Sequence, residues 1–353
     1  MQKRTPTARW RSGTKENALN TSSNNPNQPW LEGRGPGTVA AIDCGTNSIR
    51  LLIGSRQGQP TSSPGQGWID HQRLMQIVRL GEGVDETGRL SPAAIERTVT
   101  VARHYAQLCR EAQVARLRFV ATSASRDASN RADFVTQIQN IFGIDPQVVE
   151  GSEEARLSFL GATAHLPQLQ WPILVVDIGG GSTEFVYATN PDELRSISTN
   201  MGSVRVHEKF PGFAMGPDSD SGKAREWVEG VLATTDKVVD WAQVATIVGV
   251  AGTVTTVAAF ALELDEYDMD LNHDSRFTSS QMAAHCERLM RMPVAQRGDL
   301  GFMPQGREDV IGAGAGIFQQ ILQRAEDARG GEDVPVVVSE YDILDGVALA
   351  LLD

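Results

Sequence analysis

The sequence contains few cysteines and lacks any hydrophobic run long enough to cross a bilayer. Its three cysteines, Cys44, Cys109 and Cys286, are far apart and form no C-x-x-C pair, which argues against a disulfide framework and against a zinc site. Apolar stretches such as Ile173 to Val176 and Val336 to Val338 are far shorter than the roughly 20 residues of a spanning helix. These absences predict a cytoplasmic protein with no membrane partner.

The amino-terminal segment has no apolar core that could serve as a signal peptide. It is rich in Asn, Pro, Ser, Gly and Thr and holds six basic residues against two acidic ones. Such a composition buries too little apolar surface to offset the entropy of ordering. We therefore expect a flexible tail at residues 1–37. A transit peptide is the alternative, but the Asn-Pro repeats would interrupt the amphipathic helix of such a leader.

Positive charge is scarce in the rest of the chain. The formal net charge is −12, and because the tail contributes +4 the remainder carries −16. This balance argues against a nucleic-acid partner. Residues 101–131 are an exception, with six arginines against two acids, and such a local concentration leaves a polyanionic substrate open. For most of these arginines a solvated helix face is an equally good explanation.

The pattern of apolar residues changes at Thr38, where a buried strand, a polar turn and a second strand are predicted. The elements expected next are a strand at 73–79, a helix opened by Ser91 and Pro92, a strand at 117–121, a polar loop TSASRDASN, a helix at 134–142, a strand from Val148 and a helix from Glu153. Alternating strands and helices of this kind imply mixed or parallel sheets with flanking helices.

The same plan occurs twice in the chain. AIDCGTNSIRLLI at 41–53 and VVDIGGGSTEFVY at 175–187 both consist of an apolar strand that ends in Asp, then Gly, then hydroxyl residues, then a strand. A duplicated fold explains this repetition. Because 353 residues suit two domains better than one, we expect two lobes with a cleft between them.

The two turns carry the residue types that bind phosphate. Glycines let backbone N–H groups approach an anion closely, and neighbouring hydroxyls add donors. The alternative is a glycine-rich hairpin that merely permits positive φ, and two matching copies argue against it. The predicted phosphate-binding residues of these turns are Gly45, Thr46, Asn47, Ser48, Gly179, Gly180, Gly181, Ser182 and Thr183.

An acidic side chain beside a phosphate requires a cation between them. Asp43 and Asp177 end the two apolar strands, and Glu184 follows the second turn. Oxygen ligands of this kind are those that Mg²⁺ prefers. We therefore predict that Asp43, Asp177 and Glu184 bind magnesium or its waters.

Other segments also carry candidate residues. Arg126, with Ser123 nearby in the TSASRDASN turn, could hold phosphate oxygens in its planar fork, and Arg50 could do the same or could instead pair with an acid. In VGVAGTVTTV, Thr253 could contact a phosphate, or the glycines could serve only close packing. The acidic run at 264–274 is expected to be a solvated loop rather than a metal site.

Five segments in order, DCGTNSIR, TSASRDASN, SEEAR, VVDIGGGSTEFV and VGVAGTVTTV, resemble the motifs of the exopolyphosphatase and guanosine-pentaphosphate phosphohydrolase family throughout residues 38–353. The resemblance implies the duplicated, ribonuclease H-like two-lobed α/β fold of the superfamily that includes sugar kinases, Hsp70 and actin. We expect a first actin-like domain at 38–151 plus 340–353 and a second at 152–339.

The resemblance also implies an activity. It identifies Glu154 of SEEAR as the base that activates water, acting with Asp177 and Glu184. Without the resemblance, Glu153 and Glu154 would be interpreted as acids favoured at a helix start after the cap residue Ser152. The implied cofactor is Mg²⁺, and the implied substrates are inorganic polyphosphate or guanosine penta- and tetraphosphate.

Several alternatives stay open at this point. The chain resembles the short, two-domain members, which implies a preference for shorter polyphosphates, and the resemblance also implies a homodimer. A guanosine pentaphosphate phosphohydrolase, a non-catalytic sensor of these nucleotides and an ATP-dependent sugar or acid kinase are the competing functions. The SEEAR and DIGGGSTE segments favour a phosphohydrolase over a kinase.

Overall fold

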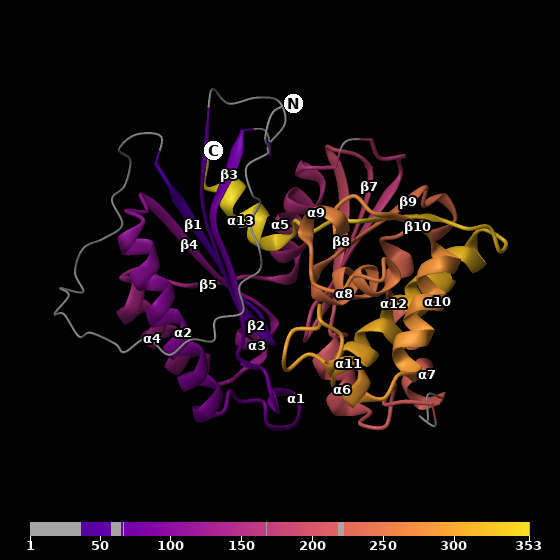
Figure 1. The fold of residues 1–353 in the computed structure, drawn as a ribbon, viewed down its shortest axis with the longest axis horizontal. Helices are drawn as coiled ribbons and strands as arrows, with labels where there is room; N and C mark the ends of the chain where they lie inside the picture. The colour runs from indigo at the N-terminus through magenta and orange to yellow at the C-terminus, as the bar shows by residue number, and fades with distance from the viewer. Residues whose placement is uncertain (1–36, 58–64, 66, 167, 218–221, 353) are drawn as a thin grey trace.

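The computed structural model describes residues 37–57, 65, 67–166, 168–217 and 222–352. The predicted tail at 1–37 therefore lies outside the described residues, apart from its last position. Figure 1 shows two lobes side by side, one mainly indigo and purple and the other mainly magenta to orange. No helix in the described ranges is long and apolar enough to span a bilayer.

The first lobe is built on a five-stranded sheet. Its strands, in spatial order, are β3 (Trp68–Ile77), β2 (Ser48–Arg56), β1 (Val39–Cys44), β4 (Arg116–Ala121) and β5 (Gln147–Val148). β1 pairs antiparallel with β2 and parallel with β4. The helices of this part of the chain are α1 (Val84–Thr87), α2 (Pro92–Glu111), α3 (Ser123–Asp127) and α4 (Arg131–Phe142).

The second lobe repeats this arrangement. Its strands, in spatial order, are β8 (Glu193–Thr199), β7 (Thr183–Asn190), β6 (Ile173–Ile178), β9 (Thr246–Val250), β11 (Pro335–Val338) and β10 (Arg276–Thr278). β6 pairs antiparallel with β7 and parallel with β9, as β1 does with β2 and β4. The shared strand order confirms the duplicated two-lobed α/β fold that the repeated turns predict, and this is the arrangement implied by the resemblance to the actin-like superfamily.

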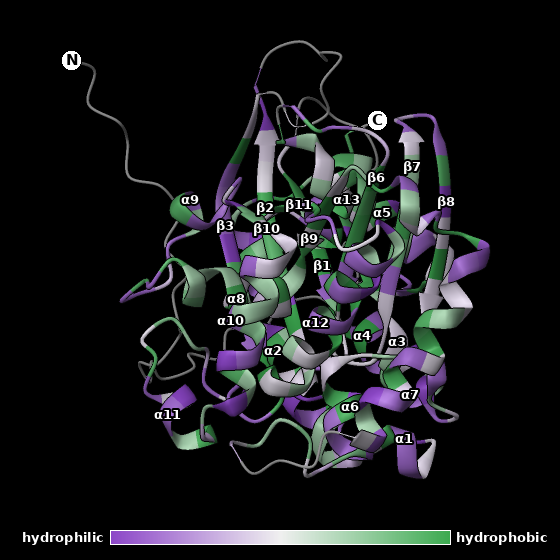
Figure 2. Ribbon diagram, turned by 90° about the vertical axis from the view of Figure 1, so that its right-hand side faces the viewer, coloured by the Kyte–Doolittle hydropathy of each residue, from purple (hydrophilic) through white to green (hydrophobic). Residues whose placement is uncertain are grey.

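The remaining helices complete the two lobes. They are α5 (Gly151–Ala164), α6 (Ser203–Lys209), α7 (Gly222–Leu232), α8 (Ala251–Ala261), α9 (Met269–Asn272), α10 (Ser279–Arg291), α11 (Val294–Gly298), α12 (Ile311–Ala328) and α13 (Ile343–Ala350), with 3₁₀ helices at Ala233–Lys237 and Trp241–Gln243. Strand β6 is buried along its whole length, whereas the edge strand β8 is exposed over its first three residues. Figure 2 shows the same contrast between hydrophobic central strands and a more polar edge.

Two local predictions need correction. The segment TSASRDASN is not wholly a loop, because it contains α3, whose turn closes when the Arg126 N–H bonds the Thr122 carbonyl at 3.0 Å. The predicted cap Ser152 lies inside α5. That helix starts at Gly151 with Glu150 as its cap residue, and the Glu154 N–H bonds the Glu150 carbonyl at 3.0 Å.

Helix α5 has three faces with different partners. Ala155, Phe159 and Ala162 pack with apolar residues of the second sheet. Leu157 packs with α13 and with strands of the first sheet. The third face carries Glu154, which lines the space between the lobes. One helix therefore contacts both lobes and the cleft.

Helices α5 and α13 cross at two glycines. A Cβ built on Gly161 would overlap the Asp342 carbonyl, and a Cβ built on Gly346 would overlap the Leu157 carbonyl. Figure 1 shows the yellow α13 beside the indigo strands of the first lobe, next to α5. The proposed domain boundaries at 151/152 and 339/340 fall at the start of α5 and just before α13, and they stay a proposal.

We predict that Gly161→Ala lowers the free energy of unfolding by about 1–3 kcal/mol, because the overlap is with backbone and no side-chain rotation relieves it. Gly230→Ala is the matched control. Gly230 lies on the exposed side of α7 with no atom near its Cβ position, so alanine there should stabilise the helix by about 0.5–1 kcal/mol. Thermal and urea unfolding of both variants measure the difference. Equal stability of the two variants would contradict the tight crossing.

Candidate functional site

A cleft of about 1420 Å³ lies between the two lobes, and residues of both lobes line it. Fourteen of the seventeen predicted site residues line this cleft; they are Asp43, Gly45, Thr46, Asn47, Ser48, Arg50, Ser123, Glu154, Asp177, Gly179, Gly180, Ser182, Glu184 and Thr253. The structure does not bring Arg126, Gly181 or Thr183 to the cleft wall. The Thr183 side chain is fully buried, and its hydroxyl donates to the Met201 carbonyl, so the geometry does not support a phosphate contact by that hydroxyl.

The first strand ends in a buried ion-pair network. Asp43 Oδ2 accepts from Arg50 Nε at 3.0 Å and from Arg50 Nη2 at 2.6 Å, and Arg50 Nη1 also donates to Asp342. Burial raises the pKa of Asp43 above its usual value, and Arg50 opposes that rise. Arg50 is therefore held by two acids, one of the two outcomes that the sequence left open, and a phosphate contact by Arg50 stays a prediction.

The glycine turns bring the lobes together. None of the glycines at 179–181 has a positive φ, so the permissive-hairpin explanation is wrong for the second turn. A Cβ on Gly181 would come within 2.6 Å of Thr46 Oγ1 and 2.7 Å of Ser123 Oγ. These two hydroxyls of the first lobe bond each other at 2.9 Å. The second turn thus needs glycine because it packs against the first turn.

Glu154 is a buried carboxylate at the cleft. It lies in the first turn of α5, where the helix dipole favours an acid, and only 7% of its surface is exposed. Arg126 Nη1 donates to Glu154 Oε2 at 2.9 Å and to the Val149 carbonyl at 3.1 Å. Burial raises the pKa of Glu154 to about 7, against the lowering effect of Arg126. Arg126 therefore bonds Glu154 and does not itself line the cleft.

Asp177 and Glu184 face the cleft together because they are paired across β6 and β7. Ser158 of α5 donates to Asp177 Oδ2 at 2.5 Å, and Ser198 of β8 donates to Glu184 Oε1 at 2.6 Å. Burial raises the pKa of Asp177 to about 7 and raises that of Glu184 well above its usual value. Three carboxyl groups with raised pKa values, including Glu154, therefore line the cleft, and the charges of Glu154 and Asp177 add to the rise in the pKa of Glu184.

An arginine that the sequence analysis missed also lines the cleft. The Nη1 of Arg307 donates to the Gly252 carbonyl at 3.2 Å. A Cβ on Gly252 would overlap the Arg307 guanidinium. Among the described arginines of the cleft, Arg307 alone has no carboxylate within ion-pair distance. Burial lowers its pKa, although arginine stays charged in proteins.

Arg307 adjoins the start of α8. That helix begins at Ala251 with no side-chain cap on its first N–H groups, and Thr253 in its first turn lines the cleft. Uncapped N–H groups at a helix start attract anions. No local pattern in the sequence marks Arg307, because its position depends on the contact with Gly252, 55 residues earlier in the chain.

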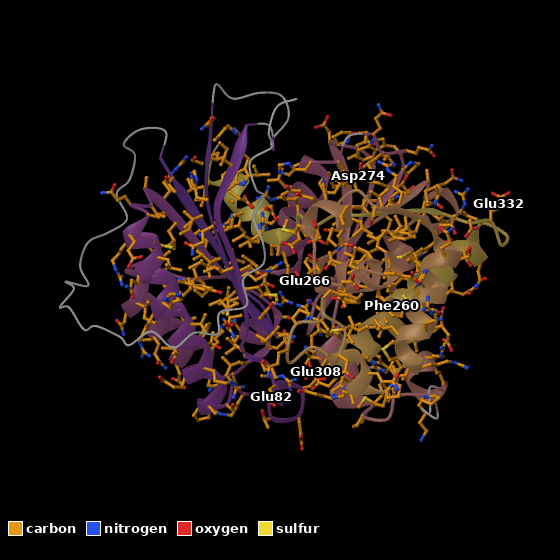
Figure 3. All side chains as sticks on the ribbon, in the orientation of Figure 1. Glu82, Phe260, Glu266, Asp274, Glu308 and Glu332 are labelled. Carbon is orange, nitrogen blue, oxygen red and sulfur yellow. The ribbon has the colours of Figure 1, made fainter. Side chains whose placement is uncertain are left out.

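Acidic side chains form one rim of the cleft. The carboxylates of Glu263, Asp265, Glu266, Asp268 and Asp270 line it and are exposed. These acids of the run at 264–274 are therefore solvated as predicted, but the run is not wholly a loop, because it contains α9. Figure 3 shows Glu266 at the boundary between the lobes. Within the described ranges, no three His, Cys, Asp or Glu residues lie close enough to hold a metal ion by themselves.

A magnesium site would therefore have to include ligands from outside the chain. Mg²⁺ is commonly bound by one or two carboxylates together with waters and phosphates of a substrate. Asp43 Oδ1 is buried and has no hydrogen-bond partner among the described residues, and such an oxygen suits a cation or one of its waters. The residues present at the end of β1 thus fit a magnesium ion that arrives with an anionic ligand.

A smaller hollow of about 640 Å³ lies on the second lobe, with Trp241 and Arg324 in its wall. None of the predicted site residues lines it. The raised pKa values and the glycine contacts occur in the larger cleft instead, and we take that cleft as the functional site.

Comparison with known proteins gives consistent results. The model of the Ppx/GppA phosphatase family matches residues 68–330. "Exopolyphosphatase 2" of Mycobacterium tuberculosis is 40% identical over 319 residues, which covers 89% of this chain and 98% of that protein. The "Bifunctional 3-dehydroquinate synthase/phosphatase" of Fusobacterium nucleatum is 31% identical, over 88% of this chain and 46% of that protein.

Solved structures are similar over the same extent. The crystal structure of an exopolyphosphatase-like protein is 38% identical with a TM-score of 0.82, and it covers 89% of this chain and 97% of its own. The Ppx/GppA family member of Aquifex aeolicus is 29% identical with a TM-score of 0.71, and it covers 90% of this chain and 97% of its own.

A further buried acid of the cleft makes stability depend on pH. Glu340 accepts hydrogen bonds from Tyr267 and Asn272, and burial raises its pKa to about 7. Between the unfolded pKa near 4.3 and the folded pKa, the unfolded chain loses this proton while the folded chain keeps it, so stability falls as pH rises. Above the folded pKa, the decrease in the free energy of unfolding has reached its full value and no longer changes with pH.

We predict that Glu340→Gln, which keeps an acceptor oxygen for both donors, is more stable than the unsubstituted chain at pH 8. The expected difference in the free energy of unfolding is on the order of 3 kcal/mol. At about pH 4.5, near the unfolded pKa, the two chains should be equally stable. Glu332→Gln, which removes a side chain that Figure 3 shows pointing outward, is the control. Urea unfolding at both pH values is the measurement. A stability difference that does not change with pH would contradict the raised pKa.

Proposed function

This chain belongs to the Ppx/GppA phosphatase family, and from that premise we propose that it is an exopolyphosphatase that releases terminal orthophosphate from inorganic polyphosphate. Its 40% identity to an exopolyphosphatase, over most of both chains, indicates a phosphoric anhydride hydrolase. The proposed reaction is an in-line attack of water on a terminal phosphorus atom.

Glu154 is the proposed general base, and its environment carries the proposal. A base works best when its pKa lies near the operating pH, and burial raises the pKa of Glu154 to about 7. Arg126 holds Oε2, and no described residue bonds the other carboxylate oxygen, which leaves Oε1 to accept a proton from water. In this proposal Arg126 orients the carboxylate while its other oxygen serves the reaction.

Groups that bind anions surround the place where a terminal phosphate would lie. Residues of the two turns, the start of α8 and Arg307 all line the cleft, and the turns and the helix start offer backbone N–H groups. Donors that are fixed before the reaction stabilise charge that develops on the phosphoryl oxygens. In this proposal Thr46, Ser182 and Thr253 add hydroxyl donors, and Arg307 binds a phosphate farther along the chain.

Magnesium is the proposed cofactor, with Asp43, Asp177 and Glu184 as the residues that would hold the ion or its waters. When bound, the ion neutralises negative charge on phosphate oxygens. The charge of the cleft supports this requirement, because eleven carboxylic residues and five arginines line it. A polyanion entering such a cleft needs accompanying cations. The same excess of acids argues against nucleic acid as a ligand.

Guanosine pentaphosphate is the alternative substrate, and binding of guanosine tetraphosphate without turnover is the alternative function.

Shorter polyphosphates are the proposed preference, because the exposed acids at 263–270 repel phosphates that extend past that rim. A homodimer and a cytoplasmic location stay predictions.

The first test is release of orthophosphate from medium-chain polyphosphate, guanosine pentaphosphate and ATP in the presence of Mg²⁺. We predict that Glu154→Gln lowers kcat for polyphosphate by about 10²–10⁴-fold, the range for loss of a general base. Glu153→Gln is the matched control, because the neighbouring Glu153 pairs with Arg118 and Arg156 outside the cleft. It should keep activity within about threefold.

The outcomes separate the candidate functions. Faster hydrolysis of guanosine pentaphosphate than of polyphosphate would reverse the order of substrates. Tight binding of guanosine tetraphosphate with no release of phosphate from any compound would indicate a sensor instead of an enzyme. Equal activity of Glu154→Gln and Glu153→Gln would exclude Glu154 as the base.

Arg307 gives a second prediction. Because a hydrogen bond to a charged group contributes about 1.5–3 kcal/mol, Arg307→Gln should lower kcat/KM for polyphosphate by about 10–150-fold. The control is Arg97→Gln, since Arg97 also lines the cleft but is exposed and paired with Glu82 at 3.0 Å. Steady-state kinetics of both variants measure the effect. Equal losses in the two variants would show that Arg307 has no specific contact with the substrate.

A further inference from the structure

We propose that Arg205 is a positioning residue that couples contact between the two lobes to the placement of Arg126 on Glu154. The inference rests on the proposed function, because it concerns the base of that reaction. Arg205 and its partner Asp127 lie outside the cleft wall, so Arg205 would act through other residues and not on the substrate.

The Arg205 guanidinium joins segments of both lobes. Within the second lobe, Nε donates to the Gly181 carbonyl of the glycine turn at 2.8 Å. Across the boundary, Nη2 donates to Asp127 Oδ2 at 2.6 Å, and Nη1 pairs with Asp85. Asp85 lies in α1 and Asp127 ends α3. Figure 1 shows α1 and α6, the helix of Arg205, at the foot of the boundary.

The contacts continue from Asp127 to the base. Asp127 Oδ1 lies 4.0 Å from Arg126 Nε, and Arg126 Nη1 donates to Glu154 Oε2 at 2.9 Å. A series of neighbouring groups therefore runs from the glycine turn through Arg205, Asp127 and Arg126 to Glu154. Each step is an ion pair or a hydrogen bond; Asp127 is exposed, whereas Arg205 and Arg126 are partly buried and Glu154 is buried.

Two acids, Asp127 and Glu154, lie near Arg126, and in this proposal Arg205 determines which of them Arg126 bonds. Asp127 is its neighbour in sequence, whereas Glu154 is 28 residues away. While Arg205 holds Asp127, that carboxylate stays at the 4.0 Å limit and Arg126 bonds Glu154. If the lobes separate, or if Arg205 is removed, Asp127 loses its partner from the second lobe. Arg126 can then pair with Asp127, and its hydrogen bond to Glu154 is lost. The base would then lose the group that orients it.

The arrangement differs from an ordinary surface salt bridge in its location. The Arg205 side chain is 15% exposed, and its two acids belong to the other lobe. Another contact between the lobes lies on the same helix, where the Gly83 N–H donates to Glu208 Oε1 at 3.0 Å. Arg324 provides a matched comparison, since it is 18% exposed and also pairs with two acids, Glu229 and Asp236, but all three residues belong to the second lobe.

The test is a set of four variants assayed for phosphate release from polyphosphate, with kcat and KM determined separately. Arg205→Gln should lower kcat about tenfold, with KM changed by less than about threefold, because the substrate contacts remain in place. Asp127→Asn added to Arg205→Gln should restore most of kcat, because a neutral amide does not compete for Arg126. Asp127→Asn alone should lower kcat less than Arg205→Gln does. Arg324→Gln should leave kcat unchanged.

Suppression of the loss in kcat by Asp127→Asn, without a parallel change in thermal stability, is the decisive result, because relief of an unpaired carboxylate in a merely structural contact would restore stability and kcat together. An unchanged kcat in Arg205→Gln, or an equal loss with and without Asp127→Asn, would overturn the inference. Thermal unfolding verifies that each variant is folded, and Arg205→Lys replaces Arg205→Gln in the same comparison if the latter does not fold. Failure of the proposed function is distinct, because the unsubstituted chain would then release no phosphate from polyphosphate.

Discussion

The crossing of α5 and α13 is the constraint on which the site depends. The crossing allows no side chain at Gly161 or Gly346, since each Cβ would overlap a backbone carbonyl across the contact. Helix α5 brings Glu154 and Ser158 to the site, one turn apart on the same face. Asp342, the cap residue of α13, holds Arg50. The proposed base, the partner of Asp177 and the network around Asp43 are therefore positioned by one helix contact.

Buried negative charge is the second feature that organises the site. Burying carboxylates is unfavourable unless they are paired or stay protonated. The chain does both, because Arg50 and Arg126 each contact an acid of the cleft, while burial raises the pKa values of Glu154, Asp177 and Glu340 to about 7. Among the described arginines of the cleft, Arg307 is left for a ligand. Acidic residues thus outnumber arginines in the site, and for this reason the proposed reaction includes a cation that accompanies the substrate.

Sequence patterns predicted the parts of the site that are local. The two turns, the strand-end acids and the helix start at Glu154 could be found because each lies in a short motif, and the repetition of the turn predicted the repeated sheet. Arg307, Asp342 and Arg205 were not predicted because their roles come from contacts 55, 292 and 78 residues distant in sequence. The cap at Glu150 was missed because Ser152 is the more usual cap type.

The glycines of the second turn allow that turn to pack closely against the first lobe. Glycine there was expected to expose N–H groups to phosphate, but Thr46 and Ser123 of the other lobe crowd the Cβ positions of Gly180 and Gly181. Any side chain would hold the lobes apart and separate Arg205 from Asp127. The close approach that brings the two turns together is therefore the same one that lets Arg205 bind Asp127. In the proposed mechanism, phosphate binding and placement of the base then depend on a single conformation, in which both lobes are in contact.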